Sequence, residues 1–297
     1  MFEMSDSVKV KKLQEQIKLL EQQREIRECL PHLSGERYKW QSEFINSSSR
    51  ICLLVAANQI GKSKSQIEKC ISWATDVEKW SDRFTVRKPR QFWYLYPSLG
   101  TVANTEINEK WIPDILPRGK FKEHPLYGWK LEYKKGDPYA LRFNSGVGIY
   151  FKSYDQNVRN LQTSTCDAIF TDEEPPENLY DELLLRLNAT RGYFNMVFTA
   201  TKGQEFFRQI IEENKIPDAH IVKGDYHDYN SVTMYDCLEF PSGNPGHITK
   251  EQIDFIKRTS KSKIEVDRRV FGKFVKEKGL KFGSFNPKKH VIEPVDY

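Results

Sequence analysis

The chain has 297 residues, enough for one large or two modest domains, and 38% of them are hydrophobic, so we expect a sizeable core. With 46 Lys and Arg against 41 Asp and Glu, the charge is mildly basic, which is compatible with a nucleic-acid partner without requiring one. The sequence argues against a membrane or secreted protein, because no apolar run approaches the roughly 20 residues of a membrane helix and no signal peptide is visible. The five cysteines are scattered and form no C-x-x-C pair. This favours reduced thiols in a cytosolic compartment and no zinc site.

Residues 5–30 are predicted to form a charged, glutamine-rich helix. Its apolar residues follow a 3,4,3 spacing and make one helical stripe of Val10, Leu13, Ile17 and Leu20. Arg24 and Arg27 interrupt the stripe, so a long coiled coil is not expected. We expect an arm that packs on its own domain; the alternative is a docking helix for another subunit or a partner.

Residues 51–63 have the pattern of a phosphate-binding loop. An apolar run, 51–57, predicts a buried strand, and a helical pattern follows from 64 to about 80. Between them, Gly61-Lys62-Ser63 ends a tight loop whose backbone N–H groups and helix N-terminus attract phosphate. Gly61 would let the backbone approach closely, Lys62 would reach the β- and γ-phosphates, and Ser63 would offer its hydroxyl to Mg²⁺.

One position departs from the standard loop pattern, because Ala56 stands where a glycine is usual. The alternative interpretation is a surface turn with an exposed lysine. A matching acidic motif further along the chain would favour the phosphate site.

The middle of the chain predicts βα units followed by an irregular region. Residues 91–96 read as a buried aromatic strand and residues 101–111 as a helix, which implies parallel βαβ units. From 112 to 150, prolines and glycines separate short alternating strands at 129–133, 140–143 and 148–153. We expect an antiparallel insertion or strands added at the edge of the sheet.

The acidic motif is Asp172-Glu173-Glu174, directly after the apolar segment 168–170. A carboxylate at the end of a strand beside a phosphate loop can hold Mg²⁺, and Asp172 is placed for that role. Glu173 would orient or deprotonate a water molecule. A solvated acidic turn is the alternative, but its pairing with the upstream loop favours an ATPase site.

Residues 195–201 predict another strand, and residues 183–191 a helix. Helices are also predicted from 249 to 259, opened by a threonine cap, and from 265 to 272. The residues from 283 to 297 show no periodicity.

Three further segments make the chain resemble the ATPase part of the large terminase of tailed bacteriophages, the motor that packages DNA into capsids. They are residues 37–41 (Arg-Tyr-Lys-Trp-Gln), 197–201 (Val-Phe-Thr-Ala-Thr) and 269–274 (Arg-Val-Phe-Gly-Lys-Phe). In that family the first reads adenine, the second couples hydrolysis to movement and the third closes the domain. This chain departs from the family in having Asn58 and Gln59 where many terminases carry an arginine.

The resemblance implies an α/β fold: a P-loop NTPase of the additional-strand, RecA-like type. It has a mostly parallel central sheet flanked by helices, with an antiparallel extension and an N-terminal helical arm. We expect the arm over residues 1–34, the ATPase domain over residues 35–282, and a linker over residues 283–297 toward a nuclease domain that this chain lacks. Nuclease activity is therefore not expected.

The implied activity is hydrolysis of ATP with Mg²⁺. Expected nucleotide ligands are Gln41, which would bond the adenine edge, and Ala57, Asn58, Gln59, Ile60, Gly61, Lys62, Ser63 and Lys64. Ser63 and Asp172 are the expected metal ligands. Glu173 would activate the attacking water. The coupling residues implied by the family are Thr199, Ala200 and Thr201.

Arg159 is the leading candidate for an arginine finger, which stabilises charge on the γ-phosphate and can come from a neighbouring subunit. It lies in a charged loop just before the acidic strand, and terminases similar to this chain use an arginine in the comparable loop. Arg186 and Arg191 are rivals, and a solvated or DNA-facing arginine is the alternative.

The resemblance also implies partners. These are double-stranded DNA, the portal protein and the small terminase subunit, in the cytoplasm of the infected host cell and without a membrane. We expect a homo-oligomeric ring on the capsid and a slow monomer in isolation. The alternatives are a helicase-type or repair translocase on the same fold, and a DNA-binding assembly module with an inactive nucleotide site.

Overall fold

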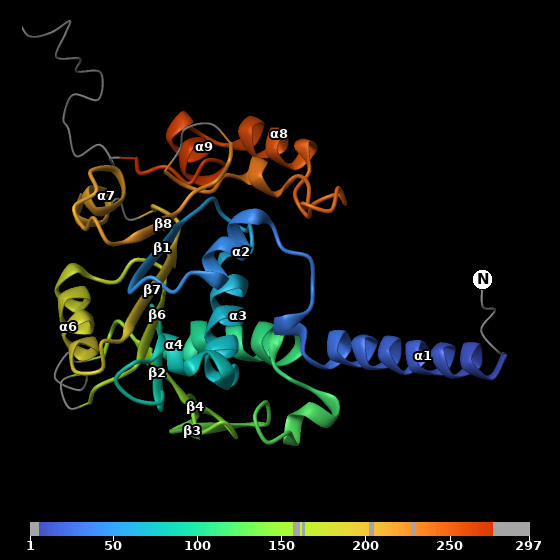
Figure 1. The fold of residues 1–297 in the computed structure, drawn as a ribbon. Helices are drawn as coiled ribbons and strands as arrows, with labels where there is room; N and C mark the ends of the chain where they lie inside the picture. The colour runs from blue at the N-terminus through green and yellow to red at the C-terminus, as the bar shows by residue number, and fades with distance from the viewer. Residues whose placement is uncertain (1–5, 157–160, 162–163, 202–204, 227–229, 276–297) are drawn as a thin grey trace, which may run out of the picture.

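The computed structural model describes residues 6–156, 161, 164–201, 205–226 and 230–275. Its centre is an eight-stranded sheet with the order β3-β4-β5-β2-β6-β7-β1-β8 (Figure 1). The strands are β1 (Ile51–Val55), β2 (Gln91–Tyr96), β3 (Trp129–Lys134), β4 (Asp137–Phe143), β5 (Gly148–Ser153), β6 (Ala168–Asp172), β7 (Tyr193–Phe198) and β8 (His220–Val222).

The six strands from β5 to β8 in this order are parallel. Strand β7 lies between β1, which leads into the predicted phosphate loop, and β6, which carries the acidic motif. This insertion defines the additional-strand type of P-loop fold, so the predicted fold class is confirmed. The carboxyl ends of β1, β6 and β7 meet at one edge of the sheet, where parallel α/β folds bind their ligands.

Helices cover both faces of the sheet (Figure 1). The α-helices of the described residues are α1 (Asp6–Cys29), α2 (Lys39–Asn46), α3 (Lys62–Thr75), α4 (Trp80–Arg83), α5 (Asn104–Glu106), α6 (Glu177–Asn188), α7 (Glu205–Glu212), α8 (Lys250–Thr259) and α9 (Lys263–Arg269). Because side chains alternate along a strand, Phe92 and Tyr94 of β2 pack with α3, whereas Trp93 packs with α6. A third core joins α2, α8 and α9 to β1 and β8.

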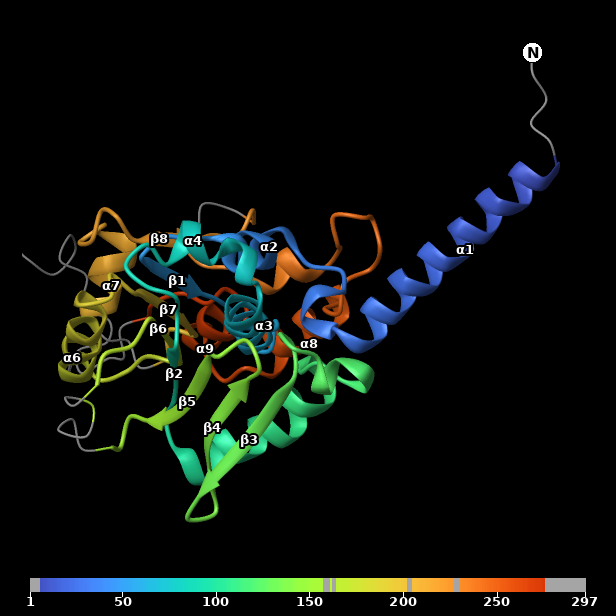
Figure 2. The same ribbon diagram turned by 60° about the horizontal axis from the view of Figure 1, so that its bottom comes forward.

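The irregular region predicted after residue 112 extends the edge of the sheet (Figure 2). Strand β5 pairs parallel to β2 on one side and antiparallel to β4 on the other, and β3 continues antiparallel from β4. The second of the two expected arrangements, strands added at the edge, is therefore the one observed.

Several predicted helix ends were wrong. The helix expected to continue to residue 80 ends at Thr75, and that expected over 183–191 begins at Glu177, directly after Pro176. Proline favours such helix starts because its missing N–H has no partner there anyway. The helix expected to span 265–272 is α9, Lys263–Arg269. The helix predicted for 101–111 runs from Leu99 to Ile115, where wider π-helical turns flank α5 and accommodate Pro113.

The N-terminal arm packs on its own domain only at its C-terminal end, where Arg118 bonds the carbonyls of Glu28 and Cys29, and not along the predicted stripe. Helix α1 projects from the body as a straight rod in both views (Figures 1 and 2). Its predicted apolar stripe is exposed to solvent, with Leu13 at 60% and Leu20 at 63% of full exposure. Within the described residues, no helix is both long and apolar enough to cross a membrane.

Candidate active site

The first residues of the loop between β1 and α3 are anchored by hydrogen bonds, and its last residues line a cavity. The N–H groups of Ala57 and Asn58 donate to Val232 O (2.8 Å) and Arg269 O (3.0 Å). These two amides therefore hold the loop in place, although they were predicted as phosphate ligands. The first N–H groups of a helix have no partner within the helix, so the start of α3 at Lys62 supplies donors for an anion.

Gly61 is the residue that turns the loop into the helix. Its φ of +93° lies in the left-handed region, and a Cβ there would meet Gln41 Nε2 at 3.3 Å. A side chain at this position would be strained by both backbone and contact. Glycine is therefore required for the turn that aims the start of α3 at the cavity.

A cavity of 770 Å³ opens in front of this loop. Its lining residues are Asn58, Gln59, Ile60, Gly61, Lys62, Ser63, Lys64, Lys110, Asp114, Ile115, Glu173, Met234, Ile256 and Arg269. Four cationic side chains face two carboxylates in this lining. Three of the four cations also pair with carboxylates outside the lining: Lys64 with Glu68, Lys110 with Glu106 and Arg269 with Glu265.

Lys62 lies at the centre of the site and joins two strand ends. Its Nζ donates to Ala57 O at 2.9 Å and to Thr199 Oγ1 at 2.7 Å. Burial lowers the pKa of Lys62, while the carboxylates of Glu173 and Asp172 act in the opposite direction. The ammonium thus lies folded onto the loop, within reach of an anion bound at the start of α3.

Ser63 and Asp172 meet although 109 residues separate them. The Ser63 hydroxyl donates to Asp172 Oδ1 at 3.2 Å. Burial and repulsion from Glu173 and Glu106 raise the pKa of Asp172 to about 7, against the opposing effects of Ser63 and Lys62. A buried carboxyl with too little positive charge around it, next to a hydroxyl oxygen that keeps its lone pairs, fits a divalent cation with oxygen ligands.

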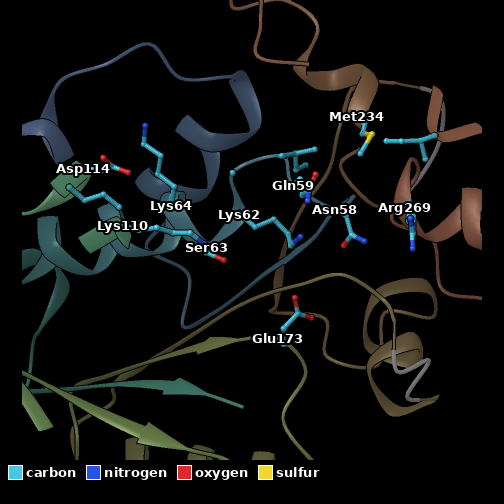
Figure 3. Close-up of a pocket in the computed structure, with 14 residues that line it drawn as sticks. Asn58, Gln59, Lys62, Ser63, Lys64, Lys110, Asp114, Glu173, Met234 and Arg269 are labelled. Carbon is cyan, nitrogen blue, oxygen red and sulfur yellow. The ribbon is translucent and has the colours of Figure 1, made fainter. Parts of the chain in front are cut away.

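Glu173 adopts a left-handed backbone, with φ +70°, immediately after β6. Its N–H donates to Val197 O at 2.9 Å, and the Tyr154 hydroxyl donates to the carbonyls of Asp172 (2.7 Å) and Glu173 (2.8 Å). These bonds maintain a conformation that non-glycine residues rarely adopt. The result is that the Glu173 carboxylate enters the cavity (Figure 3).

The predicted coupling residues separate into three environments. Thr199 lies between Lys62 and Glu173, since its hydroxyl accepts from Lys62 and its N–H donates to Glu173 Oε2 at 3.4 Å. Ala200 is buried in the core formed with α6 and α7, and Thr201 is exposed. The structure thus brings Thr199 into the site and leaves the other two outside it.

Gln41 does not line the cavity. Its Oε1 accepts from Tyr38 N at 3.0 Å, which caps helix α2, and its Nε2 donates to Ser65 Oγ at 3.0 Å. Both halves of the amide are therefore used to fasten α2 to α3 beneath the loop. Contact with adenine remains a prediction and would require these bonds to be exchanged.

The predicted arginine finger, Arg159, lies outside the described residues. Neither of its rivals lines the cavity: Arg186 forms an ion pair with Glu182 at 2.9 Å, and Arg191 occupies the turn after α6 with φ +49°. The source of the finger remains a prediction.

Two walls of the cavity were missed by the reasoning from sequence (Figure 3). Lys110, Asp114 and Ile115 project from the π-helical stretch on one side. Met234, Ile256 and Arg269 line the other side. Arg269 begins a segment that resembles the family's closing segment, but no spacing rule pointed to Lys110.

The fold and the site together define a P-loop NTPase of the additional-strand, RecA-like type. The family model for the large subunit of terminase, T4-like virus type, N-terminal part, matches residues 53–282. The chain therefore belongs to the large terminase family.

Solved structures of the same fold include two phage proteins. The chain is similar to the large terminase of the thermophilic bacteriophage D6E in complex with ADP, with 16% identity, a TM-score of 0.54, and coverage of 88% of this chain and 59% of that one. It is also similar to the large terminase ATPase domain of Thermus phage P74-26, with 15% identity, a TM-score of 0.53, and coverage of 81% and 94%. This chain thus spans 59% of the D6E protein's length, and a search of curated proteins found no match.

Proposed function

We propose that this chain binds ATP with Mg²⁺ and hydrolyses it as the ATPase domain of a DNA-packaging motor. The observation that carries the proposal is the 3.2 Å contact between Ser63 Oγ and Asp172 Oδ1, beside Lys62. It joins the phosphate loop to the acidic strand end, which is the arrangement that phosphoryl transfer in P-loop enzymes uses.

Each side chain has a proposed role that follows from its position in the cavity. The helix α3 N-terminus and Lys62 would bind the β- and γ-phosphates, and Lys110 would add positive charge from the opposite wall. Ser63 and Asp172 would hold the Mg²⁺, which when bound neutralises charge on the phosphate oxygens. The pair fits this ion because both ligands are oxygen atoms and the buried carboxyl lacks sufficient countercharge.

Glu173 would accept the proton of the attacking water. The water oxygen forms a bond to the γ-phosphorus, the bond to the bridging oxygen of ADP breaks, and phosphate leaves. Thr199 contacts both Lys62 and Glu173, so its hydrogen bonds would change when the γ-phosphate leaves. We propose that β7 transmits this change to a surface that grips DNA.

The motor role is proposed on family membership. ATP hydrolysis would drive double-stranded DNA into a procapsid, with subunits in a ring on the portal protein and with the small terminase subunit as a further partner. An ADP complex of the D6E large terminase supports nucleotide binding at this fold. Family membership favours packaging over a helicase-type translocase.

The test is ATP hydrolysis by the full chain across a range of protein concentrations, with Glu173→Gln beside it. General-base catalysis contributes about 10²–10⁴-fold, so Glu173→Gln should remove most hydrolysis and leave binding of a fluorescent ATP analogue unchanged. A rate per subunit that increases with concentration would support a ring.

Two results would count against the proposal. Hydrolysis that is equal in wild type and Glu173→Gln would remove Glu173 from the chemistry. Failure of the wild type to bind the ATP analogue with Mg²⁺ would favour an assembly module with an inactive nucleotide site.

A further inference from the structure

Arg269, the last residue of α9, lines the cavity on the wall opposite Lys110. Among the arginines of the described residues, only Arg269 belongs to the cavity lining. Its side chain is 53% exposed, and its guanidinium pairs with Glu265, four residues earlier in the same helix, at 2.8 Å. An exposed pair at this spacing contributes little stability, so the guanidinium can leave Glu265 for a more strongly charged anion.

The main chain of Arg269 is fixed to the first residues of the phosphate loop. Its carbonyl accepts a hydrogen bond from Asn58 N at 3.0 Å. Three residues later, Gly272 has a φ of +61°, and a Cβ there would meet Ala56 C and Ala57 N at 2.7 Å. The segment that follows α9 therefore lies directly against the loop, and the side chain of Arg269 starts from that point.

The first residues of the loop also mark the end of the cavity where the γ-phosphate would lie. Lys62, which in a P-loop reaches the β- and γ-phosphates, donates from Nζ to Ala57 O at 2.9 Å. The same Nζ donates to Thr199 Oγ1, and Thr199 N donates to the carboxylate of Glu173, the proposed base. The γ-phosphate therefore belongs beside Ala57, at the start of the loop.

Arg269 is anchored at this same end of the cavity. Asn58, whose N–H bonds the Arg269 carbonyl, follows Ala57 directly in the loop. Figure 3 shows Asn58 between Lys62 and Arg269. A rotation of the Arg269 side chain can therefore bring its guanidinium from Glu265 toward the position of the γ-phosphate.

The chemistry at this position favours an arginine. During transfer, negative charge is spread over the three outer oxygens of the phosphoryl group. Lys62 offers a single ammonium to them, and the carboxylate of Glu173 lies close by with a negative charge. A guanidinium adds a planar set of N–H donors that can bond two phosphate oxygens at once.

We propose that Arg269 is a catalytic residue that acts within its own chain, by turning its guanidinium from Glu265 onto the γ-phosphate when ATP is bound. The inference rests on the proposed ATPase function and adds to it a cation that stabilises the charge on the phosphoryl group in the transition state. Because this cation belongs to the same chain as Lys62 and Glu173, its contribution does not require a neighbouring subunit.

Hydrolysis of ATP by the full chain at low protein concentration tests the proposal. Arg269→Ala should lower kcat at least about 100-fold and change KM less than about threefold, because the contact strengthens in the transition state. Arg269→Lys should restore only a small part of kcat, since an ammonium cannot bond two oxygens in a plane. The matched control is Arg258→Ala, which removes an exposed arginine of α8 outside the cavity lining and should lower the rate less than about twofold.

Binding of a transition-state mimic gives a readout that does not depend on turnover. A fluorescent ADP analogue is titrated with Mg²⁺, in the presence and absence of aluminium fluoride, which takes the place of the transferring phosphoryl group. In Arg269→Ala, the increase in affinity caused by aluminium fluoride should be at least about tenfold smaller than in the wild type. Binding of the ADP analogue alone should be unchanged, because ADP lacks the γ-phosphate.

Mixing two variants tests whether Arg269 acts within its own chain. Glu173→Gln keeps Arg269 but lacks the proposed base, so it can offer its arginine to another subunit without hydrolysing ATP itself. An excess of Glu173→Gln should not restore hydrolysis by Arg269→Ala.

Three results would overturn the proposal and leave the proposed ATPase function intact. Hydrolysis by Arg269→Ala within about threefold of an active wild type would remove Arg269 from the chemistry. Equal losses from Arg269→Ala and Arg258→Ala would assign the effect to the general charge of this surface. Restoration by Glu173→Gln would place Arg269 in the site of a neighbouring subunit. By contrast, a wild type that does not bind the ATP analogue would remove both proposals together.

Discussion

The cavity and the α1 arm are built from equally local sequence patterns, yet they differ in what holds them. At the cavity, Ser63 bonds Asp172 and Lys62 bonds Thr199, across 109 and 137 residues of sequence. Along the arm, Arg24 bonds Glu28, four residues away, and both side chains are exposed. The first region is therefore defined by tertiary contacts and the second by its own helix.

The difference shows what an apolar stripe can and cannot predict. Leu183 in α6 and Leu13 in α1 are both leucines in periodic helical patterns, but Leu183 is fully buried and Leu13 is 60% exposed. Periodicity gives the helix and its apolar side in both cases. Which surface covers that side depends on the rest of the chain, or on another chain.

The largest effect is expected at the centre of the cavity. Lys62→Ala should lower ATP hydrolysis at least about 1,000-fold, because it removes a buried charge aimed at the phosphates. Lys64→Ala is the matched control. Lys64 lines the same cavity, but its side chain is 59% exposed and its Nζ lies 3.9 Å from the Glu68 carboxylate. Its loss should lower the rate of hydrolysis less than about threefold. Similar losses in steady-state assays of the two variants would show that Lys62 has no special position.

Two buried aspartates at the ends of β6 should respond in opposite ways. Asp172→Asn should raise the Mg²⁺ concentration needed for hydrolysis by about 100-fold and stabilise the metal-free fold, because it removes a poorly compensated buried charge. Asp167 accepts hydrogen bonds from Arg87 Nε and from two backbone N–H groups, so Asp167→Asn should destabilise by about 1–3 kcal/mol without altering the Mg²⁺ requirement. Magnesium titrations measure the Mg²⁺ requirement, and urea unfolding in the presence of a chelator measures stability. The same response from the two variants would contradict the assignment of Asp172 as a metal ligand.

At the junction between arm and body, His32 should make stability depend on pH. Burial, together with the charge of Arg37, lowers the pKa of its imidazole to about 3, whereas the unfolded value is 6.5. The unfolded chain therefore binds the proton first, and stability falls as pH decreases below 6.5. Between pH 7 and pH 5 the loss from this group is about 2 kcal/mol.

His32→Leu should remove that share of the pH dependence. Urea unfolding of the wild type and His32→Leu at several pH values gives the difference in their free energies of unfolding. Groups that titrate in the same way in both proteins do not contribute to this difference. Parallel stability curves for the two proteins between pH 7 and pH 5 would place the pH dependence elsewhere.

The smallest effect is expected on the arm. Leu13→Gln should change the free energy of unfolding of the body by less than about 0.5 kcal/mol when measured at dilution, because its side chain contacts solvent. Leu183→Ala, in the core under α6, should cost about 3 kcal/mol. A large loss from Leu13→Gln at dilution would mean that the arm packs on the body after all.

Much of the candidate site could be inferred because its motifs are contiguous. A strand, a loop ending in Gly61-Lys62-Ser63 and a helix require no distant contact to be recognised, and the acidic strand end is read in the same way. Lys110 could not be inferred, since its place in the cavity depends on how the helix that ends at Ile115 crosses the sheet edge. The use of Gln41 as a cap, bonded to Ser65, equally depends on the packing of α2 against α3.

By itself, the sequence determined the class of fold, the strand, loop and helix around Gly61, the acidic strand end and the helical arm with its stripe. These features follow from interactions between residues close in the chain, such as strand and helix periodicity and the conformational freedom of Gly61. Tertiary structure alone decided that Thr199 rather than Thr201 enters the site, that a π-helical stretch supplies Lys110, and that the stripe of α1 stays exposed. The physical reason is that burial and long-range hydrogen bonds depend on the whole sheet, which local patterns do not specify.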